Sequence, residues 1–437
     1  MSQKKRGTIA IVGGGIGGLN AALWLISNGW DVTIFEKGSN VDEPGAGIQI
    51  TPNASRGLLK MGLGPTLNRY GVKPAFQQFR MFDSGEVEKE TPINAEHDGA
   101  PYYQIYRPHL KQGLLARVNE LAAEMGLKHP VVHVNHEVVG FEENDSEVRL
   151  LFKDSAIQSK FDGRNESHFD LLIGADGLHS AIRKQIIHDD KPHYTGQIAW
   201  RVVVDTAKLQ PAPESERLGN VMSVFMKPSS HVVCYYLDQG KLLNFVGVLE
   251  RTHPATDGER KEGWKGKHNV EEFRRDFAGA HPALQHIINA PGFVSCNFQE
   301  LYDREPIPNY VSPKGRVVLL GDAAHPIPPY LAQGAATALR GGIVLARALD
   351  AVKPIPEATK IYENTQVPFA ERMLFASRQS GQHMHPKSRE EILERFRKSN
   401  AAVDRAWIYQ DDPEHISLIK TGYMRRPAMG DGTGQQL

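Results

Sequence analysis

A strand, a glycine-rich turn and a helix follow one another at the start of the chain, and this order constrains the fold most. Residues 8–12 are apolar and mostly β-branched, which is typical of a buried parallel strand. Gly13, Gly15 and Gly18 follow at once on G-x-G-x-x-G spacing, and an apolar helical pattern covers residues 19–28. This is the context in which that spacing binds dinucleotides, so the pattern predicts an α/β, Rossmann-like domain.

A second predicted strand, residues 31–35, ends in Glu36. An acid at this place commonly binds an adenosine ribose, while the amides near Gly15 hold a pyrophosphate. The motif does not distinguish NAD from FAD. Further on, Gly47 lies in a second glycine-punctuated turn before a helix that we expect to reach about Leu63. This turn either brings backbone close to a flat ring or is an ordinary tight connection.

Two later strands also end in carboxylates. Residues 170–174 lead to Asp176, and residues 317–320 lead to Asp322. If both strands belong to one sheet, the two acids flank one crevice at its carboxyl edge. A helix then begins near Gly334, and its N-terminus favours negative charge. The sequence therefore predicts a ligand with hydroxyl groups and an electron-rich ring.

Charge and cysteine content exclude several classes of protein. The chain has 51 Lys and Arg against 51 Asp and Glu, which gives no support to nucleic-acid binding. Its two cysteines are far apart and do not have the spacing of a metal site or a disulfide framework. No run of about 18 apolar residues predicts an integral membrane segment. We expect a cytoplasmic protein, either monomer or homodimer, without a metal.

Three motifs together resemble a known family. They are Gly-Gly-Gly-Ile-Gly-Gly at 13–18, Gly-Ala-Asp-Gly with Ser180 and Arg183 at 174–183, and Gly-Asp-Ala-Ala-His-Pro at 321–326. In this order they resemble the class A flavoprotein monooxygenases, typified by para-hydroxybenzoate hydroxylase and, more closely, by salicylate hydroxylase-like enzymes. The resemblance implies a glutathione-reductase-type FAD-binding domain, an interleaved antiparallel-sheet substrate domain and a C-terminal helical extension.

The resemblance also implies domain boundaries and roles for single residues. The expected FAD-binding domain comprises residues 1–78, 103–189 and 291–355, the substrate domain 79–102 and 190–290, the helical region 356–429 and the tail 430–437. FAD would be held by Gly13, Gly15, Gly18, Glu36 on the ribose, Gly47, Arg107 and Asp322 along the ribityl-pyrophosphate chain, and Gly334 and Ala335 beside the isoalloxazine. Asp176 would lie near both FAD and the passing NAD(P)H. From the residues alone, Arg107 is equally a cap contact at a helix entry.

Two residues of the expected substrate sheet match positions that face the substrate in the family. Arg201 could orient a phenolate, carboxylate or carbonyl group, and Tyr235 could donate a hydrogen bond. Without the resemblance, both have ordinary structural interpretations. Tyr235 and His231 are also possible proton-transfer groups, although His231 has a structural interpretation as a core residue. His325 is expected to be a structural residue of its turn.

The resemblance implies an enzyme that uses NADPH or NADH, FAD and O2, and hydroxylates an electron-rich aromatic molecule through a flavin C4a-hydroperoxide. Epoxidation or oxidation of an indole or alkene is the alternative, and a non-catalytic flavin-binding protein is a distant one. Two positions depart from the family pattern. Arg340-Gly341 replaces a common acidic pair, which puts contacts of the flavin-side helix in doubt. Tyr236 replaces a common proline, which suggests a reshaped pocket.

Overall fold

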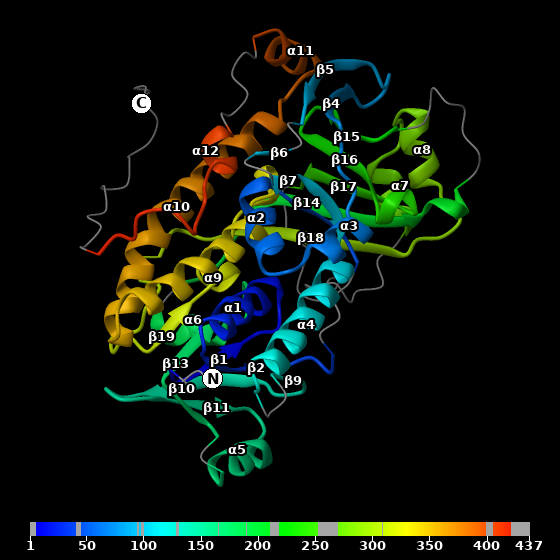
Figure 1. The fold of residues 1–437 in the computed structure, drawn as a ribbon. Helices are drawn as coiled ribbons and strands as arrows, with labels where there is room; N and C mark the ends of the chain where they lie inside the picture. The colour runs from blue at the N-terminus through cyan, green and yellow to red at the C-terminus, as the bar shows by residue number, and fades with distance from the viewer. Residues whose placement is uncertain are drawn as a thin grey trace.

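Two sheets and the helices around them form the molecule (Figure 1). The computed structural model describes residues 6–40, 45–93, 96–97, 100–127, 131–164, 166–188, 190–209, 218–251, 270–307, 309–398 and 405–420. The expected tail at 430–437 lies outside the described residues. Among the described residues, no helix combines the length and the apolar character needed to cross a bilayer.

The first sheet is parallel and has five strands in the order β19-β13-β1-β2-β9. The strands are β1 (Thr8–Val12), β2 (Asp31–Phe35), β9 (Val132–His133), β13 (Leu171–Gly174) and β19 (Val317–Leu319). Their apolar side chains are almost completely buried, which explains why these strands read as continuous hydrophobic runs. The adjacent parallel strands β13 and β19 confirm that the acidic turns at 176 and 322 share one sheet edge.

Helices α4 (Arg107–Glu124) and α9 (Gly334–Ala351) both pack against α1 (Ile16–Ser27) over this sheet. A three-stranded antiparallel sheet of β10 (Val138–Glu143), β11 (Val148–Phe152) and β12 (His168–Phe169) lies beside it. Helix α5 (Ser155–Asp162) follows β11, and α6 (Ala181–Ile186) follows β13. Edge-to-face contacts of Phe35 with Phe152, Phe161 and Phe169 join these elements to β2.

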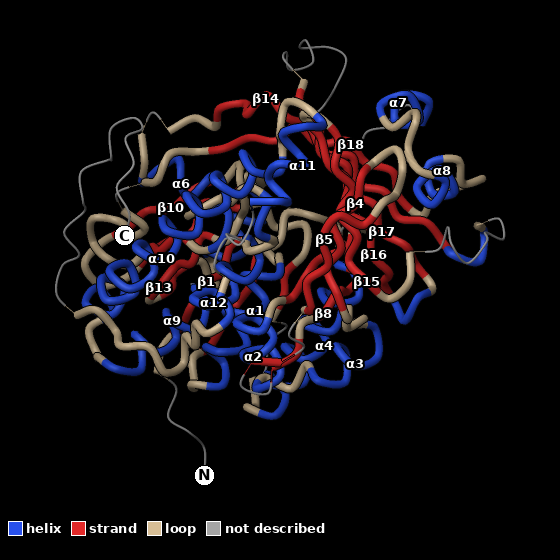
Figure 2. The backbone as a smooth tube through the Cα atoms, turned by 90° about the horizontal axis from the view of Figure 1, so that it is seen from above, coloured by secondary structure: helices blue, strands red, loops and turns tan. Residues whose placement is uncertain are grey.

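The second sheet has seven strands in the order β18-β14-β17-β16-β15-β4-β5 (Figure 2). They are β4 (Phe76–Met81), β5 (Val87–Pro92), β14 (His193–Asp205), β15 (Val221–Lys227), β16 (Ser230–Leu237), β17 (Leu242–Glu250) and β18 (Ser295–Asp303). All pairings are antiparallel except β15 with β4. One face packs against α7 (Val270–Asp276) and α8 (Pro282–Ile288). On the other face α11 (Arg389–Lys398) packs on β4 and β15, and residues of β14, β16 and β17 line the space between the two sheets.

The remaining elements connect the two sheets. Strand β3 (Gly47–Ile50) pairs with β8 (Tyr103–Tyr106), β6 (Glu96–His97) pairs with β7 (Ala100–Pro101), and α2 (Pro52–Lys60) and α3 (Gly64–Tyr70) follow β3. The C-terminal helices α10 (Ile355–Met384), α11 (Arg389–Lys398) and α12 (Ala406–Tyr409) run along both halves (Figure 1).

The C-terminal segment supplies a partner for the unusual arginine of α9. Arg340 Nε donates to Asp411 Oδ2 at 2.9 Å, and both side chains are buried. The Arg340 guanidinium also lies 4.0 Å from the centroid of the Phe369 ring and donates to Gln366. Thus the departure at residue 340 does not leave α9 without contacts, because a carboxylate from a distant segment neutralises the charge.

Replacing Asp411 by alanine is expected to lower the free energy of unfolding by about 3–5 kcal/mol, because a buried guanidinium loses its counter-charge. Thermal or urea unfolding of the FAD-loaded protein measures this loss. The matched control is Asp412→Ala, which removes a neighbouring carboxylate that bonds the exposed His415 and the backbone N–H of Glu414. Equal effects of the two substitutions would show that the buried pair contributes nothing specific.

Candidate functional site

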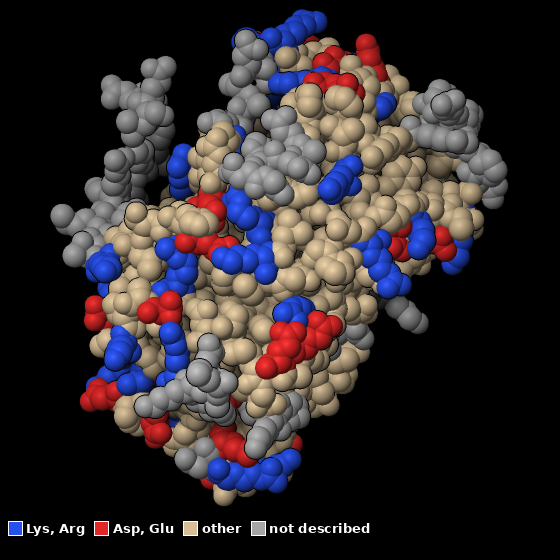
Figure 3. Space-filling view, in the orientation of Figure 1, with Lys and Arg blue, Asp and Glu red and all other residues tan. Residues whose placement is uncertain are grey.

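A cavity of about 1800 Å³ lies between the two sheets and is lined by both. Pockets for one small molecule usually measure about 300–1,000 Å³, so this cavity has room for a dinucleotide and a second molecule. The face of the molecule in Figure 3 carries acidic and basic side chains side by side. The cavity, by its size and its lining from both sheets, is the candidate ligand-binding feature.

The three glycines of the first turn differ in why the structure can accept or requires glycine there. A Cβ on Gly13, at φ +109°, would lie 2.3 Å from the carbonyl oxygen of Ala175, and one on Gly18 would lie 2.2 Å from that of Gly13. Gly15 is different, because it adopts an ordinary φ of −74° and a Cβ there would meet nothing within 4 Å. Packing within the protein therefore does not require glycine at 15. The space beside Gly15 belongs to the cavity, at the N-terminus of α1, where helices commonly bind phosphate groups.

Glu36 stands at the end of β2 and also lines the cavity. Its carboxylate accepts hydrogen bonds from the backbone N–H groups of Gly14, at 2.9 Å, and Gly38, at 2.8 Å. These bonds fix the carboxylate beside the glycine turn. Each carboxylate oxygen has a second lone pair, so a ribose hydroxyl can still donate to it.

Asp176 lines the cavity, but its side chain is mainly engaged with α6. Its Oδ2 accepts from the N–H groups of Ala181 and Ile182 at 2.7 and 3.4 Å. Burial raises the pKa of Asp176, and its Oδ1 is buried without a hydrogen-bond partner. The backbone at Gly177, where a Cβ would meet nothing within 4 Å, is the open part of this turn.

Two buried arginines hold the two acidic turns together. Arg183 donates to the carbonyl oxygens of Ala323 and Ala324 at 3.0 Å each, and Arg304 donates to that of Leu178 at 3.0 Å. Asp190 bonds both guanidinium groups. Asp322 itself is exposed to the cavity at the carboxyl end of β19. The sequence motif included Arg183, but nothing in the sequence pointed to Arg304 or Asp190.

The N-terminus of α9 forms the floor of the cavity. Gly334 and Ala335 line it, and a Cβ on Gly334 would touch only the carbonyl oxygen of Ile327, at 4.0 Å. The preceding Gln333 exchanges hydrogen bonds with Asn53, at 3.2 Å, and Thr51, at 3.0 Å. These bonds join the N-terminus of α2 to that of α9, and the positive end of α9 faces the cavity.

The cavity face of the second sheet is the roof of the cavity. Gly47 and Arg107 line the cavity where this roof approaches the floor. The N–H of Gly47 donates to Asn244 Oδ1 at 2.7 Å, and a Cβ on Gly47 would lie 2.7 Å from the hydroxyl of Tyr235. Glycine is thus required here by close packing of the roof. Arg107 begins α4 and lines the cavity, and its charge acts on Arg201 across the cavity.

Both expected substrate residues lie on the cavity face of the second sheet. Burial and the charge of Arg107 lower the pKa of Arg201 to about 10, so the guanidinium remains positive at neutral pH. Its Nε donates to Gln299 Oε1 at 3.1 Å. Burial raises the pKa of Tyr235, which is therefore a neutral phenol. This end of the roof combines two cations with hydrogen-bond donors.

His231, for which the sequence left two interpretations open, also lines the cavity. It shares one face of β16 with Val233 and Tyr235, because alternate residues of a strand point the same way. Tyr235 comes four positions after His231, which places the two residues about 13 Å apart along the strand. The alternation of β16 therefore puts both side chains on the cavity face, at well-separated places along the strand.

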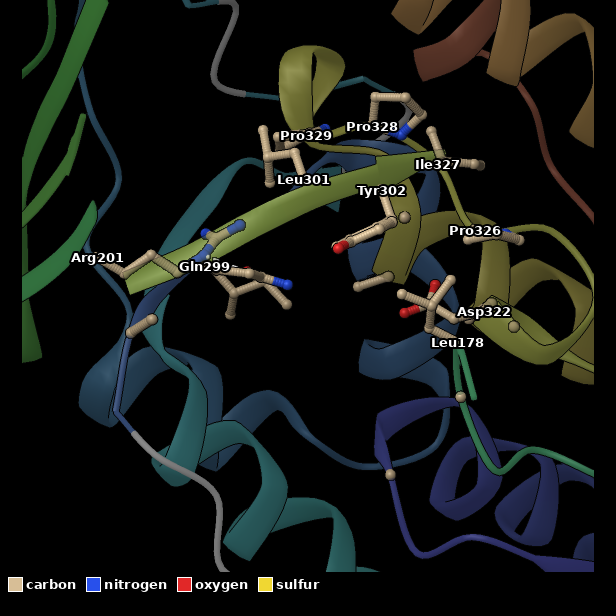
Figure 4. A pocket seen from close by; sticks show the side chains of 18 of the residues that line it. Leu178, Arg201, Gln299, Leu301, Tyr302, Asp322, Pro326, Ile327, Pro328 and Pro329 are labelled. Atoms are coloured by element: carbon tan, nitrogen blue, oxygen red, sulfur yellow. Dashed lines mark hydrogen bonds between the residues drawn. The ribbon is translucent and has the colours of Figure 1, made fainter. Parts of the chain in front are cut away.

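Figure 4 shows how the walls face one another. Leu178 and Asp322 lie at one side of the cavity, and Arg201 with Gln299 lies at the other. The loop 326–329 runs along its edge.

Two further expectations concern residues that do not face this space. Tyr236 packs into the apolar cluster on the α7 and α8 side of the sheet, so the expectation that it reshapes the pocket is wrong. The alternation of β16 directs it away from the cavity. His325 is buried against Tyr310, with ring centroids 5.8 Å apart, as expected for a structural residue of its turn.

Comparison with known proteins identifies the fold and the family. Residues 6–284 and 309–377 match the family described as "FAD binding domain". The 3-amino-4-hydroxybenzoate 2-monooxygenase of Streptomyces cremeus is 32% identical over 92% of this chain and 94% of its own length. The 3-hydroxybenzoate 6-hydroxylase of Klebsiella oxytoca is 31% identical over 86% and 88%. A salicylate hydroxylase substrate complex superposes with a TM-score of 0.72 at 24% identity, covering 93% of this chain and 96% of that one.

Proposed function

The chain belongs to the FAD binding domain family and is a class A FAD-dependent aromatic monooxygenase, and from this premise we propose that its substrate is an aromatic carboxylic acid with a ring hydroxyl. When bound, FAD supplies electron transfer from NAD(P)H and the activation of dioxygen. The residues of the chain bind and orient the cofactor and the substrate, exclude water and move protons.

The cavity supports one arrangement of the cofactor. The open backbone at Gly15 and the N-terminus of α1 would hold the pyrophosphate, and Glu36 would accept from the adenosine ribose. Arg107 and Asp322 would lie along the ribityl-pyrophosphate chain. Gly334 and Ala335, at the positive end of α9, would lie beside the isoalloxazine, where negative charge develops on reduction.

The substrate proposal rests on how the roof is divided. Arg201, whose charge couples to that of Arg107, marks one end, and His231 marks the other. Between them Val233, Val246 and Val248 line the cavity with apolar surface. A carboxylate would bind at the arginine end, the ring would lie on the valines, and a hydroxyl would reach the histidine. The names of the relatives, a 3-amino-4-hydroxybenzoate 2-monooxygenase and a 3-hydroxybenzoate 6-hydroxylase, support the proposed substrate class.

The test is binding and turnover of a matched panel of substrates. We expect 3- and 4-hydroxybenzoate to perturb the flavin absorbance and to stimulate oxidation of NADH or NADPH, and the product to gain one oxygen by mass. The corresponding hydroxybenzamides, which lack the carboxylate, should bind at least about tenfold more weakly. Equal binding of acids and amides, or selective turnover of an indole, would contradict the proposal.

A further inference from the structure

The edge strand of the roof carries a buried amide beside Arg201. Asn297 belongs to β18 and lies directly opposite Arg201 of β14 in the antiparallel register. Directly opposed side chains on one face of such a pair have Cβ atoms about 4.5–5.5 Å apart. Both residues line the cavity, whereas the next residue, Phe298, packs into the apolar cluster on the α7 and α8 side. The amide of Asn297 and the guanidinium of Arg201 therefore serve the same part of the cavity.

The amide of Asn297 has no partner within the protein. The residue is only 7% exposed, and its Nδ2 is buried without a hydrogen-bond partner. Within the described part of the chain, its Oδ1 has no partner either. Folded proteins leave few buried amides in this condition, because an unpaired polar group is destabilising. A ligand in the cavity is the remaining source of a partner.

The strand that carries Asn297 is held in place, so only the plane of the amide is free to turn. The hydroxyl of Ser295 donates to the carbonyl oxygen of Gly45 at 2.5 Å. On the other face of β18, the rings of Phe298 and Trp200 meet edge to face with centroids 5.2 Å apart. The terminal torsion of an asparagine has a broad energy profile, so a ligand decides whether the NH2 or the carbonyl faces it.

The register shows where the polar part of the roof ends. Arg201 is opposed on its other side by Val246 of β17, and Val246 is opposed by Val233 of β16. All of these residues line the cavity. Across the roof, the row therefore consists of an amide, a guanidinium and then two apolar side chains. The two polar groups stand together, away from the surface on which the ring would lie.

We propose that Asn297 is a second substrate-binding residue at the arginine end, where its NH2 donates to a carboxylate oxygen and makes the site selective for acids over neutral amides. This inference rests on the proposed function, because it takes the substrate to be an aromatic carboxylate. Arg201 supplies the positive charge, and its Nε is already engaged by Gln299 Oε1 at 3.1 Å. A carboxylate accepts about four hydrogen bonds, so it uses a further donor. A donor bonds an ionised acceptor more strongly than a neutral one.

The first variant removes the donor without adding charge. In Asn297→Leu, which has a side chain of similar size, we expect 3- and 4-hydroxybenzoate to bind at least about tenfold more weakly, as for loss of a hydrogen bond to a charged group. The corresponding hydroxybenzamides should weaken less, because their neutral carbonyl accepts a weaker hydrogen bond. Titration of the flavin absorbance of the oxidised holoenzyme measures each affinity.

The second variant, Asn297→Asp, keeps the size of the side chain and adds a negative charge. Its carboxylate repels that of the substrate but accepts from the NH2 group of a hydroxybenzamide. We expect the ratio of acid affinity to amide affinity to fall at least about a hundredfold, so that the amide becomes the better ligand. The matched control is Asn289→Asp, at the exposed C-cap of α8, which should keep the wild-type ratio.

The outcomes separate substrate binding from support of the roof. Acid affinity within about threefold of the wild type in FAD-loaded Asn297→Leu overturns the inference. Equal weakening of acid and amide also overturns it, as does a shift of the ratio in Asn289→Asp equal to that in Asn297→Asp. If Asn297→Leu does not retain FAD, a wild-type ratio in Asn297→Asp overturns the inference by itself. A wild type that binds the acids no better than the amides would instead refute the proposed substrate class.

Discussion

Replacing Arg201 by glutamine is expected to weaken binding of a hydroxybenzoate roughly 30-fold or more. Loss of one partner of a buried, hydrogen-bonded charge pair costs about 2–5 kcal/mol, and each 1.4 kcal/mol is about a factor of ten. Arg201 remains positive at neutral pH, and it lies on the cavity face of β14 beside Gln299. Titration of flavin absorbance with 3- and 4-hydroxybenzoate measures the effect.

The neutral hydroxybenzamides separate a charge effect from a change of pocket shape. We expect Arg201→Gln to bind them about as well as the wild type does, and to retain FAD. Arg164→Gln, at an exposed arginine near α5, is the matched control and should leave every affinity unchanged. If acid and amide weaken together in Arg201→Gln, then Arg201 supports the shape of the roof, and the carboxylate binds elsewhere.

Local patterns in the sequence predicted the elements that hold the cofactor. The strand at 8–12, the glycine spacing after it and the two strands that end near Asp176 and Asp322 are each visible within about ten residues. Parallel strands of one sheet present their carboxyl ends at the same edge, so these local signals were sufficient to place the acids together. The antiparallel sheet that contains β14 to β17 was expected only from the resemblance to the family, which implied a substrate domain of this kind.

The contacts that join distant segments could not be predicted in this way. Asp411 neutralises Arg340 from 71 residues away, and His385 meets His231 from 154 residues away. Such pairs depend on how distant segments pack together in the fold. The local periodicity of hydrophobic residues in the sequence carries no information about that packing. The turn at Asp176 shows a second limit, because its side chain caps α6 while its backbone faces the cavity. A motif predicts where a residue stands, and only the packing decides which of its atoms is available.

A substitution at Gly15 is expected to change cofactor binding without changing folding. Replacing it by valine is expected to reduce FAD affinity by at least about a hundredfold, or about 2.7 kcal/mol, with little change in the stability of the apoprotein. The reason is that φ at Gly15 suits any residue and a Cβ would meet no protein atom within 4 Å, so the side chain projects only into the cavity. Fluorescence titration of the apoprotein with FAD and thermal unfolding without it measure the two quantities.

Substitutions at two other glycines are the controls for the Gly15→Val experiment. Gly13→Ala should destabilise the apoprotein itself, because φ is +109° and the new Cβ would lie 2.3 Å from the carbonyl oxygen of Ala175. Gly292→Ala, in open space away from the cavity, should change neither quantity. If Gly15→Val binds FAD like the wild type, the pyrophosphate does not lie against this turn. If it unfolds like Gly13→Ala, then glycine at 15 serves the fold, and the argument that a ligand requires it fails.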